Sequence, residues 1–228
     1  MQRRESHEAN GVVGAVTDAI ASRSIGEWFD ALAAEVPTPG GGAFAAIAGA
    51  GGAALVAMTA RLTVHKAGFE AVTERMQQII DEADEARVTL TDLADRDGVA
   101  FDRAMAAYKL PKDSDDKRTA RLLELQAALE GAAEVPLTVA RRAVYVMGLA
   151  EEVTENGNPN AASDGLSGAA ALHAATVAAL ANVQINAFAF TDQVRRGELM
   201  DDVRRLRDRA DALLADVDEA FRARVTAE

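Results

Sequence analysis

The sequence predicts an all-α protein, an antiparallel up-and-down helical bundle with two uncharged central helices. Apolar residues recur at spacings of three and four along the long segments, which is typical of amphipathic helices. No segment shows the alternation of apolar and polar residues that indicates a strand. Two stretches, Gly40–Ala60 and Gly165–Phe190, contain no Asp, Glu, Lys or Arg, so we expect both to be buried central helices.

Composition limits the architecture further. The chain has 228 residues and 49% of them are hydrophobic, which suits one domain with a sizeable core. We predict a loosely ordered lead-in over residues 1–22 and a single helical domain over residues 23–228. The absence of cysteine excludes disulfides and thiolate chemistry, and the three histidines lack metal-ligand spacing. We therefore expect no metal and no permanently bound cofactor.

Charge and hydropathy argue against two classes of partner. The formal net charge of −12 argues against non-specific binding to nucleic acid. The two uncharged stretches consist mostly of Ala and Gly, so we expect them inside protein and not in a membrane. The N-terminal residues lack the apolar run of a signal peptide, which favours a cytoplasmic location.

The first predicted helix leads into a glycine-rich loop. Ser24 and Glu27 have the spacing of a capping box at the start of an amphipathic helix, which ends before Pro37. The loop contains Pro39 followed by Gly40, Gly41 and Gly42. Glycines let a ligand or a second backbone approach closely, and the N-terminus of the next helix offers free N–H groups. Two interpretations stay open, a ligand-binding loop and a loop that only permits tight packing.

The remaining elements follow from periodicity and from turn residues. Pro136 interrupts a helical pattern, where it either kinks one helix or starts a second one. Pro159 is suited to the start of the second uncharged helix, where its missing N–H costs nothing. The predicted helices after the first uncharged one cover residues 69–107, 116–134, 136–154, 161–190 and 198–225, with breaks at 65–68 and near Gly197.

Several polar residues in and beside the second uncharged helix need an explanation, because an unpaired buried polar group costs about 1–3 kcal/mol. Asn182 and Asn186 are four residues apart and share one helix face, as do Asn160 and Asp164, with Ser163 beside them. A structural interpretation makes the first group helix caps and gives the later asparagines bonds to neighbouring helices. A functional interpretation makes them a pocket wall, with Asp164 as an acid/base or a ligand carboxylate.

Other candidates are weaker. Asp97 lies on a charged helix, where an aspartate is more often solvated than catalytic, and Tyr108 lies near the end of the same helix. Lys66 follows the first uncharged helix, where it suits an anionic ligand group or interacts favourably with the helix dipole.

Motifs in order along the chain resemble those of the cyclodeaminase/cyclohydrolase family. They are SIGEWFDALAAEVPTPGGG, AALVAMTARLT, DRDGVAFDRAMAAYKLPK, GNPNAASD and ANVQIN, and the similarity covers about Ser24 to Leu214. The family comprises the C-terminal domain of formiminotransferase-cyclodeaminase and stand-alone methenyltetrahydrofolate cyclohydrolases. The resemblance implies a helical subunit that forms a homodimer, with a folate site near the subunit interface.

Motif matching implies a set of site residues. The resemblance assigns the site loop to Pro39, Gly40, Gly41 and Gly42, and the second wall to Asn158, Asn160, Ser163, Asp164, Asn182 and Asn186, with matches at Asp97 and Tyr108. Two positions depart from the family pattern. Ala43 replaces a serine that usually follows the glycines, and Lys66 alone keeps the basic character of a lysine-rich stretch.

The resemblance implies one of two reactions on a tetrahydrofolate substrate. Hydrolysis of the 5,10-methenyl bridge gives 10-formyltetrahydrofolate, whereas cyclodeamination of 5-formiminotetrahydrofolate releases ammonia. The absence of a formiminotransferase domain favours the hydrolase slightly. Asp164 is the first candidate for proton transfer and Lys66 for the anionic tail of the folate. A non-catalytic folate-binding homologue and a purely structural helical oligomer stay open as alternatives.

Overall fold

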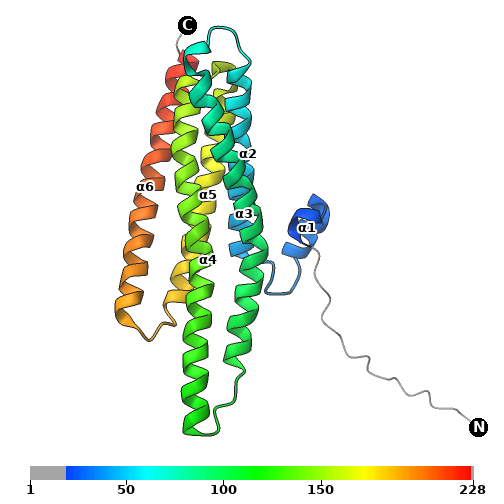
Figure 1. Ribbon diagram of the computed structural model, residues 1–228, viewed down its shortest axis with the longest axis vertical. Coiled ribbons are helices and arrows are strands. Elements are labelled where there is room, and N and C mark those ends of the chain that lie inside the picture. Colours follow the sequence, from blue (N-terminus) through cyan, green and yellow to red (C-terminus); the bar gives the residue numbers. More distant parts are fainter. Residues whose placement is uncertain (1–18, 227–228) are drawn as a thin grey trace, which may run out of the picture.

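The structure is a computed structural model that describes residues 19–226, and within that range all regular secondary structure is helical (Figure 1). The all-α prediction is therefore confirmed. The elements in order are η1 (Ile20–Ser22), α1 (Ile25–Leu32), α2 (Gly41–Val64), η2 (Glu70–Val72), α3 (Thr73–Tyr108), α4 (Asp115–Asn156), η3 (Pro159–Ala161), α5 (Ala162–Ala187) and α6 (Gln193–Thr226).

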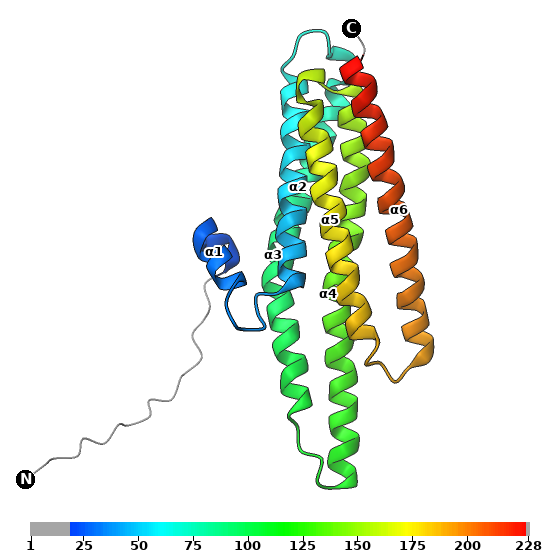
Figure 2. The same cartoon turned by 180° about the vertical axis from the view of Figure 1, so that it is seen from behind.

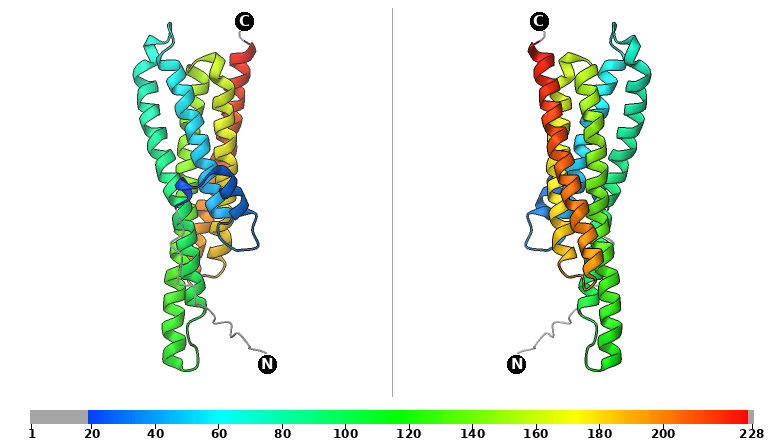
Figure 3. Two further views of the ribbon diagram at one scale, coloured as in Figure 1. Left: turned by 90° about the vertical axis from the view of Figure 1, so that its right-hand side faces the viewer. Right: turned by 90° about the vertical axis from the view of Figure 1, so that its left-hand side faces the viewer.

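Helices α2 to α5 form an antiparallel four-helix bundle in which consecutive helices are neighbours and α5 returns to pack on α2. Helix α6 lies against α4 and α5 (Figure 2). The α3–α4 hairpin extends beyond the end of the bundle where α2 begins and α5 ends, and α1 stands beside the start of α2 (Figure 3). The predicted up-and-down arrangement is confirmed.

Small residues bring the two uncharged helices, α2 and α5, close together. A Cβ atom on Gly52 would lie 2.8 Å from the carbonyl oxygen of Gly168, and a Cβ on Gly168 would lie 3.0 Å from the carbonyl oxygen of Gly52. Only glycine fits at this crossing without a shift of backbone. Fully buried alanines such as Ala53 and Ala175 continue the contact, so the core consists of closely packed backbones with few bulky side chains.

The two uncharged helices are buried on one side only. Both are long and apolar enough to cross a membrane by length and composition, but 61% of the apolar window of α2 and 44% of that of α5 are buried inside the bundle. Their other sides lie next to each other on one face of the molecule (Figure 2). We call this the α2/α5 face. By helical spacing we assign to it the exposed residues Phe44, Gly51, Met58, Leu62, Ser167, Ala170, Ala174, Ala181 and Ile185.

The structure overturns two of the breaks that the sequence suggested. Helix α4 continues without a break through Pro136, so the possibility of two helices is wrong. The predicted break near Gly197 is also wrong, because α6 begins at Gln193 and Gly197 lies within it. The chain reverses at residues 188–192 instead. There Asp192 Oδ1 accepts hydrogen bonds from the backbone N–H groups of Val194 (2.9 Å) and Arg195 (3.1 Å), which explains the early start.

The first helix has the predicted start. Ser24 and Glu27 form the capping box, in which Glu27 accepts a hydrogen bond of 2.8 Å from the backbone N–H of Ser24. Trp28 is buried and joins α1 to the core around the start of α2. Of the predicted lead-in, residues 1–18 lie outside the described residues. The backbone N–H of Ile20 donates to Asp95 of α3 at 3.0 Å, so its last residues are attached to the bundle.

Candidate functional site

A cavity of about 360 Å³ lies where α2 begins and α5 ends, and residues of α3 and α4 also line it. It brings together seven residues that the sequence singled out: Gly40, Gly41, Gly42, Asp97, Tyr108, Asn182 and Asn186. The other lining residues are Pro37, Thr38, Phe101, Ala104, Met105, Leu129, Ala132, Ile185 and Ala189. Apolar walls with a few polar groups are typical of a small-molecule site.

Asp97 is the only carboxylate among the lining residues, and its expected solvation is wrong. The side chain is half-buried and lies against the first turn of α2, where a Cβ atom on Gly42 would be 2.1 Å from Asp97 Oδ1. Gly42 therefore makes room for the carboxylate. Burial raises the pKa of Asp97 above its ordinary value, and the nearby backbone N–H of Ala43 offsets part of this increase. A carboxyl group with a raised pKa in a cavity is suited to proton transfer.

The glycine loop forms the upper wall of this cavity and starts α2. Gly40 is the N-cap in an extended conformation, and no side chain caps the helix. The free backbone N–H groups and the positive end of the helix dipole therefore lie beside Asp97. Pro39 lines the adjacent hollow beneath α1 instead of the cavity, as does Ala43. The hydroxyl group that Ala43 lacks would not point into the cavity of this chain.

Asn182 and Asn186 each donate one amide N–H within the protein. Asn182 Nδ2 donates to the carbonyl of Ala178 on its own helix at 2.9 Å. Asn186 Nδ2 donates to the carbonyl of Ala132 on α4 at 2.8 Å. The predicted bond to a neighbouring helix is confirmed for Asn186 and wrong for Asn182. No hydrogen bond from residues 19–226 reaches the Oδ1 atom of either side chain, so both oxygens remain for a ligand.

Some lining residues escaped the sequence analysis. Phe101 and Met105 follow Asp97 by one and two helical turns and precede Tyr108, so helical spacing alone could have placed them on the same face. Leu129 and Ala132 of α4 carry no comparable signal, because they are ordinary apolar positions of a core helix.

The other predicted site residues lie at the opposite end of the bundle. Asn158 Oδ1 accepts hydrogen bonds from Lys66 Nζ at 2.5 Å and from the backbone N–H of Asn160 at 3.0 Å. Asn158 Nδ2 donates to the carbonyl of Leu62 at 3.3 Å, and its backbone N–H donates to Thr63 Oγ1 at 2.9 Å. Asn158 thus ties the end of α2 to the start of η3.

Asp164 and Ser163 lie in the first turn of α5 near this tie. Capping of α5 by Asn160, Ser163 or Asp164 is wrong, because Ala161 is the N-cap and no side chain caps it; Asn158 caps η3 instead. At 1.5 Å per residue, the 24 residues of α2 separate the two ends by about 36 Å. Within one chain the structure therefore does not bring Asp164 or Lys66 to the cavity.

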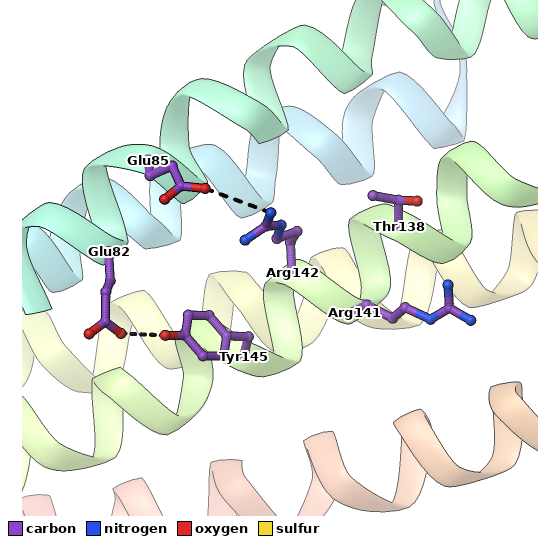
Figure 4. Close-up of a pocket in the computed structure, with 6 residues that line it drawn as sticks. All are labelled: Glu82, Glu85, Thr138, Arg141, Arg142 and Tyr145. Carbon is purple, nitrogen blue, oxygen red and sulfur yellow. Dashed lines mark hydrogen bonds and ion pairs between the residues drawn. The ribbon is translucent and has the colours of Figure 1, made fainter.

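A second hollow lies between α3 and α4 and differs in character (Figure 4). Its charged groups pair with one another: Arg142 approaches Glu85 at 3.7 Å, and the hydroxyl group of Tyr145 donates to Glu82. Exposed pairs of this kind contribute little to stability. Because these groups bind one another, they leave few hydrogen-bond donors or acceptors for a ligand. Among residues 19–226, no group of three His, Cys, Asp or Glu side chains is placed to hold a metal ion.

The fold and the cavity define a class of protein, a helical bundle with an acid- and amide-lined small-molecule site at a glycine-rich helix start. Comparison with known proteins makes this specific. The formiminotransferase-cyclodeaminase family model matches residues 24–205, and the chain belongs to this family.

Two curated relatives and one solved structure are similar to the chain. A methenyltetrahydrofolate cyclohydrolase from Methylorubrum extorquens is 37% identical over 90% of this chain and 98% of the relative. A formimidoyltransferase-cyclodeaminase from Gallus gallus is 32% identical over 84% of this chain, which spans 35% of that longer protein. The crystal structure of a formiminotetrahydrofolate cyclodeaminase from Thermotoga maritima superposes with a TM-score of 0.82 at 34% identity, covering 90% of this chain and 99% of that one.

Proposed function

We propose that this protein hydrolyses the 5,10-methenyl bridge of tetrahydrofolate to give 10-formyltetrahydrofolate. The observation that carries the proposal is the half-buried Asp97 in the cavity at the glycine loop of a chain of this family. The near full-length similarity to a methenyltetrahydrofolate cyclohydrolase supports the hydrolase within the family. The cytoplasm, where reduced folates are found, is part of the same proposal.

Asp97 supplies the proton transfers that this reaction needs. As a base, its carboxylate takes a proton from a water molecule while the water oxygen attacks the cationic methenyl carbon. In the neutral adduct, the new hydroxyl group loses its proton as the carbon–N5 bond breaks. The bonding electrons go to N5, which receives a proton from Asp97, and one proton is released overall. Before the attack, the carboxylate also stabilises the cationic bridge.

Cyclodeamination is the second candidate, because the similar solved structure and the relative from Gallus gallus carry that activity in their names. In that reaction N10 attacks the formimino carbon, and the adduct expels ammonia after it receives a proton. The absorbance of the 5,10-methenyl group separates the two reactions. A hydrolase removes this band faster than a buffer blank does, whereas a cyclodeaminase creates it from 5-formiminotetrahydrofolate with release of ammonia. If neither rate exceeds the blank, the protein is not an enzyme for these substrates.

We further propose that the protein is a homodimer with the site near its interface. The α2/α5 face is apolar and carries no formal charge, which is unusual for a surface that stays in water. Two copies that pack through this face in antiparallel orientation bring the glycine-loop end of one chain to the Asn158 end of the other. This arrangement adds Asp164 and Lys66 of a second copy to the cavity, where Lys66 is suited to the anionic tail of the folate.

Mixing two inactive variants tests this composite site. Asp97→Asn and Asp164→Asn proteins are mixed and allowed to exchange subunits. If each site takes one of these residues from each chain, half the dimers are mixed and one of their two sites is intact, so about a quarter of the wild-type activity returns. No recovery, with exchange confirmed by mass spectrometry, would show that both residues act within one chain or that Asp164 is not in the site.

The dimer itself is tested by adding charge to the α2/α5 face. Met58→Glu and Ala174→Glu are expected to give monomers that keep their helical content. Val88→Glu is the matched control, because Val88 is 60% exposed on α3, away from this face. Light scattering would contradict the proposal if the first two variants kept the mass of the wild type.

A further inference from the structure

Helix α4, which lines the cavity through Leu129 and Ala132, contains a proline whose missing N–H group has a visible consequence. In an α-helix, the N–H of residue 136 would donate to the carbonyl of Ala132, but Pro136 has no N–H, although α4 continues through it. The carbonyl oxygen of Ala132 is thus left without its helical donor. Ala132 is only 7% exposed, so water has little access and the oxygen needs a donor from the protein.

Asn186 of α5 supplies that donor. Its Nδ2 lies 2.8 Å from the carbonyl oxygen of Ala132. The opposite orientation of the amide would place two oxygen atoms at this distance, and their repulsion excludes it. Because the Nδ2 atom is committed to Ala132, the Oδ1 atom of Asn186 is left for the cavity that the residue lines.

The side-chain amide of Asn182 also keeps its oxygen atom free, but for a different reason. Its Nδ2 donates to the carbonyl of Ala178, so its Oδ1 is also left over. The two amide oxygens and the carboxylate of Asp97 are all acceptors, and no Lys, Arg or His side chain lines the cavity. These three acceptors favour a ligand edge that carries several N–H donors, because a buried acceptor without a donor is costly.

We propose that Pro136 is a positioning residue that fixes the amide of Asn186, so that Asn186 and Asn182 together read hydrogen-bond donors on the ligand. For a folate, an identity that rests on the proposed function, the donors are the exocyclic amino group and the N–H groups of the pterin ring. The same two amide oxygens are suited to any heterocycle that carries N–H donors along one edge.

A double-mutant cycle tests the coupling between Pro136 and Asn186. In Asn186→Asp an oxygen faces the carbonyl of Ala132, so the melting temperature is expected to fall by several degrees. In Pro136→Ala the helical N–H is restored, and adding Asn186→Asp there is expected to cost less than half as much. Gln184→Glu is the matched control, because it adds the same charge to an exposed neighbouring position of α5. An equal loss in both backgrounds would overturn the role of Pro136.

Ligand affinity tests whether the Oδ1 atom of Asn186 accepts hydrogen bonds from N–H groups of the ligand. Asn186→Leu removes the oxygen and is expected to raise KM for the methenyl substrate about tenfold, with a smaller effect on kcat. Pro136→Ala/Asn186→Asp keeps an acceptor and is expected to stay within about threefold of Pro136→Ala alone. An unchanged KM in Asn186→Leu would overturn this half of the proposal.

The two levels of the proposal can fail separately. If the wild type binds pterin but turns over no folate, the proposed function fails. The pterin Kd of the Asn186→Leu variant then shows whether the Oδ1 atom of Asn186 recognises N–H donors on the ligand. If the wild type does not bind pterin at all, the reading of donors is overturned. The melting-temperature cycle decides the orientation of Asn186 in either case.

Discussion

The two ends of the α2–α5 bundle carry similar polar residues but use their hydrogen-bonding capacity in opposite ways. At the η3 end, Asn158 makes four hydrogen bonds, to Lys66, Leu62, Thr63 and Asn160. At the glycine-loop end, Asn182 and Asn186 each donate to a carbonyl group and keep an oxygen free beside Asp97. Residue type therefore does not distinguish a structural contact from a ligand site. The two ends differ in whether the side-chain oxygen atoms are left without a hydrogen-bond donor from the protein.

The largest expected effect at the glycine-loop end is that of Asp97→Asn. Loss of the acid/base is expected to lower kcat by about 10²–10⁴-fold. Substrate affinity is expected to fall by a smaller factor, because asparagine fills the same space but lacks the charge that stabilises the cationic bridge. Asp92→Asn is the control on the same helix, since its side chain is 66% exposed and does not line the cavity. Steady-state kinetics with both variants checks this expectation, and equal activity of the two would remove Asp97 from the mechanism.

Gly42→Ala tests the space beside the carboxylate without changing a polar group. The new Cβ atom would lie 2.1 Å from Asp97 Oδ1, so the carboxylate has to move. We expect at least a tenfold loss of kcat/KM and destabilisation by about 1–3 kcal/mol. Gly148→Ala, at a helical glycine with nothing within 4 Å, is expected to be neutral or to stabilise. Similar behaviour of the two variants would contradict the close approach at Gly42.

The pH dependence of stability gives a smaller effect with a definite sign. Burial raises the pKa of Asp97, so folding favours its protonated form. The stability that this group contributes is present below its unfolded pKa and is lost as the pH rises through its higher folded pKa. Asp97→Asn is therefore expected to melt above the wild type at pH 7, by a margin that shrinks towards pH 3. A margin that grew on acidification would contradict the raised pKa.

At the η3 end, two threonines form a matched pair. Thr63 and Thr59 are both fully buried on α2, and each donates to the carbonyl four residues earlier. Only Thr63 also accepts a hydrogen bond from another element, the backbone N–H of Asn158. Thr63→Val leaves that N–H unpaired, so we expect a loss of about 1–3 kcal/mol, and less for Thr59→Val. Thermal unfolding measures both, and an equal loss would show that the tie contributes nothing.

The sequence predicts the helices well because each carries its own periodicity and stop signals. The capping box at Ser24, the break before η2 and the glycine start of α2 all depend on neighbouring residues alone. The effect of Pro136 is not local. Helix α4 continues through it, and Asn186, fifty residues later in the sequence, supplies a donor for the carbonyl of Ala132 that the proline leaves free.

Part of the candidate site was predictable for a similar reason. Asn182 and Asn186 attract notice as amides in an uncharged helix, and Gly40 to Gly42 as a loop. The importance of Asp97 is not visible in the sequence. Its charged neighbours on the same helix suggest a solvated side chain, while its burial arises from Gly42 on another helix. The separation of Asp164 and Lys66 from the cavity is a consequence of helix length and topology, which motifs in a linear sequence do not express.

The most direct test of the account is a crystal structure of the protein with a non-hydrolysable folate analogue. We predict that the pteridine ring occupies the cavity beside Gly42, with its N–H groups within hydrogen-bond distance of Asn182 Oδ1 and Asn186 Oδ1 and its N5–N10 edge facing Asp97. A ring bound elsewhere, with no contact to Asp97 of any copy, would contradict the assignment of the active site to the glycine-loop end.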